Sequence, residues 1–284
     1  MATAPVHVFP RWVQSLLLVG AVLARIATVA AAPADTTPAD AWRELAVGNA
    51  REARALFLRA RTSQPAALRE TQMGEAVALL NLQPVTTRNR DAARRLCAEV
   101  AAASPADAWN VYARYLLGRI AEIHSNPSDL AGAAGHYEWV FTQHPDSEWG
   151  QTALVKYAIV QLQATVTAEE TARRYQRLVE LEPRLAEPSA RRDFHLVLAA
   201  ACFQHGFGRE AALRHLLIAE AAGVKQPIRA ATVQIQIAEL SRELGHLPQA
   251  RAYYERFLAE AGEGDTRALL VKERLATLPA GAKP

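Results

Sequence analysis

Histidine and cysteine side chains are the residues of this 284-residue chain whose chemistry is best suited to binding a metal. His195, His205 and His215 recur ten residues apart, and His136 and His144 lie eight apart. Metal sites on one helix need ligands four residues apart, or else a tight Cys/His cluster. Neither arrangement occurs, so the sequence predicts no metal and no other cofactor.

Motifs for catalysis are also missing from the sequence. There is no G-x-S-x-G elbow, no glycine loop that cradles a phosphate and no H-E-x-x-H. Glu169 and Glu170 are adjacent, so on a helix they do not face each other, and they suit a helix start instead. The sequence therefore predicts that the protein is not an enzyme.

The charge balance gives no support for nucleic-acid binding. The chain carries 32 basic and 29 acidic residues, a net charge of +3. Because residues 1–34 contain Arg11, Arg25 and no acid, the remainder has 30 basic and 29 acidic residues. The densest basic stretch, "RNRDAARR" at 88–95, is interpreted as a solvated helix start rather than a phosphate site. No nucleic-acid partner is predicted.

The first 34 residues are typical of a secretory signal peptide. Arg11 precedes an apolar run from Trp12 to Ala24, and small residues follow up to Ala34, which favours cleavage before Asp35. The alternative is an uncleaved anchor, although a span needs about 20 apolar residues and Arg25 interrupts this run. The sequence predicts export to the periplasm or cell envelope, with membrane contact only through this segment if it is retained.

A repeat of about 40 residues organises the rest of the chain. Helix-forming Ala, Leu, Arg and Glu dominate, no stretch alternates as a strand does, and the predicted class is all-α. Six segments each contain a small residue, a larger one four later, an apolar one three after that and a helix breaker five beyond. The breakers are Pro65, Pro105, Pro145, Pro183, Gly223 and Gly262.

Another helical run precedes most of these segments, as at 110–123, 194–204 and 232–244. Each repeat is therefore predicted to be a helix, a turn and a second helix. The small residue lets the first helix approach closely, and the breaker ends the second helix. We expect an α-solenoid of about six such repeats over 35–262, followed at 263–284 by a capping helix and a short tail.

The chain resembles the tetratricopeptide repeat family over about residues 41–262. The sixth repeat carries the resemblance best, with Ala238, Gly245, Ala250, Tyr254 and Phe257 at family positions. The period exceeds the family's usual 34 residues and the Trp-Leu-Gly opening is mostly absent. The phrase "YEWVFTQHPDSEWGQTALVKYA" is similar to bacterial envelope repeat proteins of the outer-membrane-assembly and Tol-system coordinator type. A Sel1-like repeat, favoured by "HGFGREAALRHLLIAEAAG", is the rival resemblance.

This resemblance implies a concave groove lined by the first helix of each repeat, in which a partner peptide or helix binds. Aromatic residues together with arginine suit such a groove, although packing within the stack is the competing interpretation. The positions carried over are Tyr112, Tyr115, Arg119, Glu122, Asp193, Phe203, Gln204, Glu239 and Arg242.

Trp139 is a further candidate from helical geometry. Tyr137, Val140 and Phe141 share the face that meets the first helix, whereas Trp139 points about 200° away from Tyr137. It either packs on the neighbouring repeat, near Trp149, or anchors the partner.

The two cysteines are predicted to be buried free thiols. Cys97 belongs to the second repeat and Cys202 to the fifth. Repeats in a solenoid touch only their neighbours, so the two Cα atoms should lie well beyond the ~7 Å that a disulfide tolerates.

Together these observations predict a non-catalytic scaffold or adaptor that binds a protein partner in the bacterial cell envelope. Two alternatives remain open. One is a membrane-anchored structural subunit of an envelope or secretion machine, and the other is a helical scaffold that handles peptidoglycan or another glycan.

Overall fold

The computed structural model describes residues 37–104, 106–262 and 264–279. The predicted signal segment 1–34 lies outside these residues, as do the expected breaker Pro105 and the tail 280–284. None of the helices in the described ranges combines the length and the hydropathy needed to cross a membrane.

The described residues form helices and contain no strand, so the predicted all-α class is confirmed. The chain divides into two compact units with the boundary between Ala113 and Arg114, within α5. Unit 1 contains α1 Pro38–Ala46, α2 Ala50–Ser63, the 3₁₀ turn Pro65–Ala67, α3 Leu68–Asn81, α4 Thr87–Ala102 and the start of α5 Ala108–Arg119. Unit 2 contains the rest of α5, the π turn Ile120–His124, α6 Leu130–Gln143, α7 Glu148–Gln163, α8 Ala168–Leu181, the 3₁₀ turn Glu182–Arg184, α9 Pro188–His205, α10 Arg209–Ala221, α11 Pro227–Glu243, α12 Leu247–Glu260 and α13 Arg267–Thr277.

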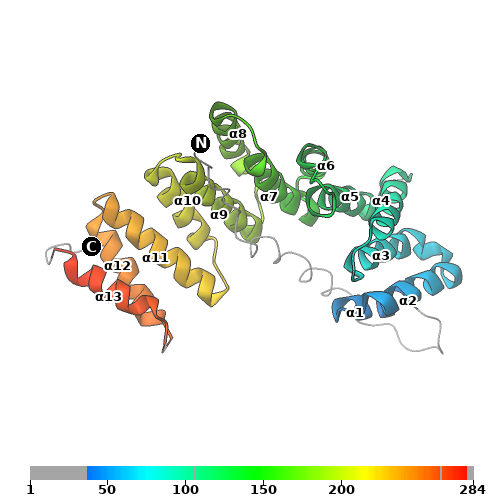
Figure 1. Ribbon diagram of the computed structural model, residues 1–284, viewed down its shortest axis with the longest axis horizontal. Helices are drawn as coiled ribbons and strands as arrows, with labels where there is room; N and C mark the ends of the chain where they lie inside the picture. The colour runs from blue at the N-terminus through cyan, green and yellow to red at the C-terminus, as the bar shows by residue number, and fades with distance from the viewer. Residues whose placement is uncertain (1–36, 105, 263, 280–284) are drawn as a thin grey trace, which may run out of the picture. The chain divides into compact units, whose positions relative to one another are not determined.

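Helices pack against their near neighbours in the chain. In unit 1, α2 packs on α1 and α3, and α3 also packs on α1 and α4. In unit 2, α7 packs on α6, α8 and α9, and α10, α11, α12 and α13 follow one another in contact (Figure 1). Within each unit, the described helices that pack extensively are one or two places apart in the chain.

The helix breakers act where the spacing predicts. Pro65, Pro145, Pro183, Gly223 and Gly262 each lie two residues beyond the last residue of α2, α6, α8, α10 and α12. Gly223 has a φ of 91°, a left-handed conformation that favours glycine after a helix. The second helix of each predicted repeat is thus confirmed as a helix, and so is the helix expected at 265–278.

One equivalent position is buried in all six second helices, and we call the six residues at this position the seam positions. They are Phe57, Cys97, Tyr137, Tyr175, His215 and Tyr254, none of them more than 4% exposed. Phe57 shows how tightly this position packs. Its ring meets the edge of Trp42 at 5.0 Å between centroids, and lies so close to Gly74 of α3 that a Cβ there would sit 2.2 Å from ring atoms.

The first helices α3 and α7 are buried on all sides. Residues 73–80 and 153–160 are each eight consecutive buried positions. Both stretches therefore face neighbouring helices all round and leave no side chain for an open groove.

The prediction of two buried cysteines is confirmed, and both thiols are free.

Gln151 ties two turns together within unit 2. Its buried amide nitrogen donates to the carbonyl oxygens of Pro145 at 2.6 Å and Arg184 at 2.9 Å. Its amide oxygen accepts from the backbone nitrogens of Ala186 and Glu187, at 2.8 and 3.1 Å. One side chain thus satisfies polar groups of the turn before α7 and the turn before α9.

Candidate functional site

Three of the expected groove residues lie in the interior of unit 2. Tyr115, Arg119 and Glu122 are 5%, 4% and 5% exposed. The Tyr115 ring packs between Tyr137 and Trp149, with centroids 5.7 and 4.9 Å away. Such burial argues against direct contact of these side chains with a partner and assigns them to packing.

The candidates on α9 and α11 are more accessible. Phe203 is 51% exposed and Gln204 is exposed beside it. Asp193 is half-buried between Arg192 at 3.0 Å and Arg229 at 3.5 Å. Glu239 and Arg242, also half-buried, pair with each other at 2.8 Å. A binding role for these residues stays a prediction.

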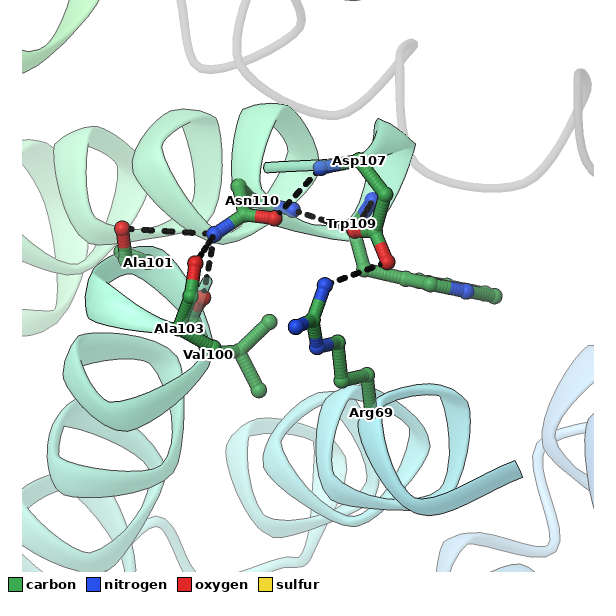
Figure 2. Close-up of polar contacts among 7 residues, drawn as sticks. All are labelled: Arg69, Val100, Ala101, Ala103, Asp107, Trp109 and Asn110. Atoms are coloured by element: carbon green, nitrogen blue, oxygen red, sulfur yellow. Dashed lines mark hydrogen bonds and ion pairs between the residues drawn. The ribbon is translucent and has the colours of Figure 1, made fainter. Parts of the chain in front are cut away.

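Tyr112 lies on α5, and a polar corner between α4 and α5 fixes the start of that helix (Figure 2). The Asn110 amide nitrogen donates to the carbonyl oxygens of Val100 and Ala103, each at 2.8 Å. Asp107 accepts from the first amides of α5 and from Arg69 Nη1 at 2.6 Å. The corner fixes the start of α5, where the half-buried rings of Trp109 and Tyr112 meet at 6.4 Å.

Trp139 is half-buried and contacts side chains of unit 2. The Arg114 guanidinium lies 5.0 Å from the centre of its ring, and the His144 ring lies 5.5 Å away. Trp149, the expected neighbour, packs on Tyr115 instead. As predicted, Tyr137, Val140 and Phe141 are core.

A buried ionic cluster surrounds Glu122, which the π turn after α5 carries. Its Oε2 accepts from Arg119 Nη1 at 2.9 Å and from the Tyr137 hydroxyl at 2.6 Å. Lys156 Nζ lies 3.6 Å from Oε1, and its side chain is 2% exposed. One carboxylate therefore faces two cations in the interior.

Burial sets the protonation of this cluster. It lowers the pKa of Lys156 to about 8, although Glu122 pulls in the opposite direction. Burial raises the pKa of Tyr115 to about 12 and that of Tyr137 well above its ordinary value. Both phenols therefore stay neutral at pH 7, and the Tyr137 hydroxyl donates its proton to Glu122 within this ion network.

A second buried chain of polar groups links α8, α9 and α10. His195 Nδ1 lies 2.9 Å from His215 Nδ1, and His215 Nε2 lies 2.8 Å from the Tyr175 hydroxyl. The Cys202 thiol donates to that hydroxyl at 3.4 Å. At the other end, His195 Nε2 lies within ion-pair distance of Glu182 Oε1, at 3.1 Å, without the direction of a good hydrogen bond.

One arrangement of protons satisfies this chain without charging either histidine. Cys202 donates to Tyr175, Tyr175 to His215 Nε2, and His215 Nδ1–H to His195 Nδ1, which leaves the His195 Nε2 proton facing Glu182. Burial lowers the pKa of His215 to about 4 and also lowers that of His195. Neutral rings are therefore favoured at pH 7.

Two surface grooves lie between successive second helices. The α2–α4 groove has a volume of about 440 Å³ and is lined by Arg51, Arg54, Ala55 and Leu58 of α2 with Pro84 and Thr86 ahead of α4. The α10–α12 groove has a volume of about 590 Å³ and is lined by Leu213, Arg214 and Leu217 of α10 with Leu244, His246 and Pro248 near the start of α12. Both occupy the gap between one second helix and the turn that leads into the next.

Within the described ranges no three His, Cys, Asp or Glu side chains are placed to hold a metal ion. Comparison with models of known protein families finds no match, and comparison with curated proteins finds no significant relative.

Sequence reasoning overlooked the ionic cluster and both grooves. Lys156 offered a signal, because a lysine inside the apolar run "TALVKYAIV" needs a buried carboxylate nearby. The grooves had no such signal, since they depend on how far apart successive second helices lie.

Proposed function

We propose that this protein is an exported, non-catalytic adaptor of the bacterial cell envelope. In this proposal about six tetratricopeptide-like helix pairs form an α-solenoid that holds a segment of a protein partner. One observation carries the proposal: within each unit, the described helices that pack extensively lie one or two places apart in the chain. Solenoids are built in this way, whereas closed bundles bring distant helices together.

The seam positions support the same proposal. Six equivalent residues, 38 to 40 positions apart, are all buried in the second helices, as stacked copies of one supersecondary element require. Such stacks present long surfaces that suit an extended or helical segment of another protein. The α13 helix fits the role of a terminal cap, since Val271 is buried against Tyr254 and Phe257 while Leu269 stays exposed.

Each unit offers its own exposed residues for contact with a partner. In unit 2, Phe203 and Gln204 are the exposed members of the expected first-helix set, whereas α3 and α7 offer no exposed stretch in their central turns. Leu58, 38% exposed in the α2–α4 groove, adds an apolar contact outside the first helices.

Site-specific photo-crosslinking in cells tests the adaptor function. A benzophenone amino acid replaces Phe203 or Leu58, and Arg95, exposed on α4, serves as the matched control position. We expect a discrete adduct of defined mass from Phe203 or Leu58 and none from Arg95. If the protein is folded and exported and neither Phe203 nor Leu58 gives an adduct, a partner at these surfaces is excluded.

A further inference from the structure

The α2–α4 groove has an excess of positive charge. Arg51, which lines the groove, is exposed and has no ion pair among the described residues. The same is true of Arg88, which lies in the chain between the lining residues Thr86 and Asn89. Arg54 Nε donates to Glu75 Oε1 at 3.3 Å, and Arg61 Nη2 donates to Oε2 of the same carboxylate at 2.6 Å, so two arginines share one acid. Arg51 and Arg88 thus have no carboxylate among the described residues, and Arg54 shares the single carboxylate of Glu75 with Arg61.

Nearby acids are already paired with other arginines. Glu52 contacts Arg59 at 3.1 Å, and Asp91 lies 3.6 Å from Arg90 and 3.9 Å from Arg94. The positive charge at the groove therefore stays uncompensated within unit 1, and it attracts carboxylates of a second molecule.

The floor of this groove is apolar. Ala55 and Leu58 on α2 face Pro84 across the groove, and Leu58 is 38% exposed. The groove has a volume of about 440 Å³ and can hold one large apolar side chain. Burial of that side chain would remove the apolar floor of the groove from water. A nucleic acid offers phosphates but no aliphatic side chain to occupy such a floor.

We propose that the α2–α4 groove binds an acidic peptide segment of a protein partner. One apolar side chain of the segment lies on Ala55, Leu58 and Pro84, and flanking carboxylates pair with Arg51 and Arg54. This inference rests on the proposed adaptor function and adds to it the chemistry of the partner.

The α10–α12 groove provides a comparison inside the same chain. It occupies the equivalent place between two second helices and also has an apolar floor, made by Leu213, Leu217 and Pro248. Its lining mixes Glu210 with Arg214, and Arg209 beside it pairs with Glu243 at 2.7 Å. Excess positive charge is therefore a property of the α2–α4 groove and not of this kind of groove in general.

Peptide binding to the purified chain from Asp35 onward tests the inference. Fluorescence anisotropy is measured with labelled Glu-Asp-Leu-Phe-Glu-Asp, with the basic counterpart Lys-Lys-Leu-Phe-Lys-Lys and with Glu-Asp-Gly-Gly-Glu-Asp, which lacks the apolar pair. We expect the first peptide alone to bind, more weakly as salt rises. Arg51→Glu should weaken binding about 10-fold or more, because it reverses a charge at the contact.

Arg95→Glu is the matched control, since it makes the same charge change at an exposed arginine of unit 1 outside the groove. It should leave binding unchanged, and circular dichroism checks that both variants fold. No binding of the acidic peptide, equal binding of the basic peptide, or equal losses in the two variants would overturn the inference. Tighter binding of a single-stranded oligonucleotide, lost in Arg51→Glu, would also overturn it in favour of a nucleic-acid site.

The peptide and crosslinking experiments can fail separately. Crosslinks from Phe203 in cells without peptide binding in vitro would remove the acidic-peptide site and leave the adaptor function standing. Peptide binding without any crosslink in cells would retain the groove's chemistry and remove the proposed cellular role.

Discussion

Lys156 shows at the scale of a single residue how a buried charge is tolerated. The surrounding helices exclude water, and Glu122 is shared with Arg119, so the cluster holds one positive charge too many. Desolvation of the ammonium group is costly under these conditions, and its lowered pKa is the consequence.

Replacing the two partners of this cluster should have opposite effects. Lys156→Met removes the surplus charge and keeps an apolar stem, so we expect a gain of about 1–3 kcal/mol in the free energy of unfolding at pH 7. Glu122→Gln leaves two buried cations without a carboxylate and should cost about 3–5 kcal/mol. Urea denaturation followed by circular dichroism measures both.

The pH dependence provides a check on the cluster. Lys156 has a pKa of about 8 in the folded protein and 10.5 ordinarily, so the unfolded chain binds more protons between these values. The contribution of Lys156 to the free energy of unfolding therefore rises as pH increases from 8 to 10.5. Lys156→Met should abolish that rise. A variant that keeps the rise would show that another group causes it.

The histidine pair predicts a loss of stability in mild acid. His215 takes up its proton near pH 4 when folded but near 6.5 when unfolded, so its contribution is complete above pH 6.5 and falls as pH drops toward 4. We expect unfolding at pH 5 to require about 2 kcal/mol less than at pH 6.5. In His215→Phe this difference should shrink, although the variant is less stable throughout because the Tyr175 hydroxyl and His195 lose a partner.

His246→Gln is the control variant for the comparison of unfolding free energy at pH 5 and pH 6.5. His246 is exposed at the start of α12, so its replacement should leave the acid sensitivity as in the parent protein. Equal acid sensitivity in His215→Phe and the parent protein would contradict the assignment to the buried pair.

At the scale of the helices, two glycines predict opposite responses to alanine. A Cβ at Gly74 of α3 would meet the buried Phe57 ring at 2.2 Å, so Gly74→Ala should destabilise the protein by about 1–3 kcal/mol. At Gly135 of α6 a Cβ would meet nothing within 4 Å. Gly135→Ala should therefore stabilise by about 0.5–1 kcal/mol through helix propensity alone.

Thermal unfolding of both glycine variants gives the comparison. Lower stability in each would show that helix propensity does not decide the effect at Gly135. Higher stability in each would mean that α2 and α3 separate easily at the Phe57 contact.

Helices and their ends could be predicted from the sequence because they depend on local chemistry. The small residue, the larger seam residue and the breaker repeat in one linear pattern, and α2, α6 and α12 follow it closely. Glu169 and Glu170, expected at a helix start, lie in the first turn of α8, where the Thr167 side chain accepts a hydrogen bond from the backbone amide of Glu170.

The exposure of first-helix side chains could not be predicted in the same way. Arg119 and Glu122 have polar side chains that suit a groove, yet both are buried because each meets the other and neighbouring helices cover them. Their burial depends on the helices around α5, and no pattern within the segment reports it.

For the whole molecule, processing of the first 34 residues is the decisive prediction. Export with cleavage should give a mature protein that begins at Asp35, because the small residues before it fit a signal-peptidase site. N-terminal sequencing or intact mass of the protein isolated from the envelope fraction measures this start. An intact N-terminus in the membrane fraction would favour the anchored structural subunit over the proposed soluble adaptor.

Gln151 has a consequence for how this chain can change in length. Its amide binds the Pro145 carbonyl on one side and the 184–187 turn on the other, so neither connection can gain a residue without disturbing both. Insertions and deletions should accordingly be rare among close homologues at these two places. Natural variation in loop length would then gather at turns outside the reach of this amide, such as the one around Gly245.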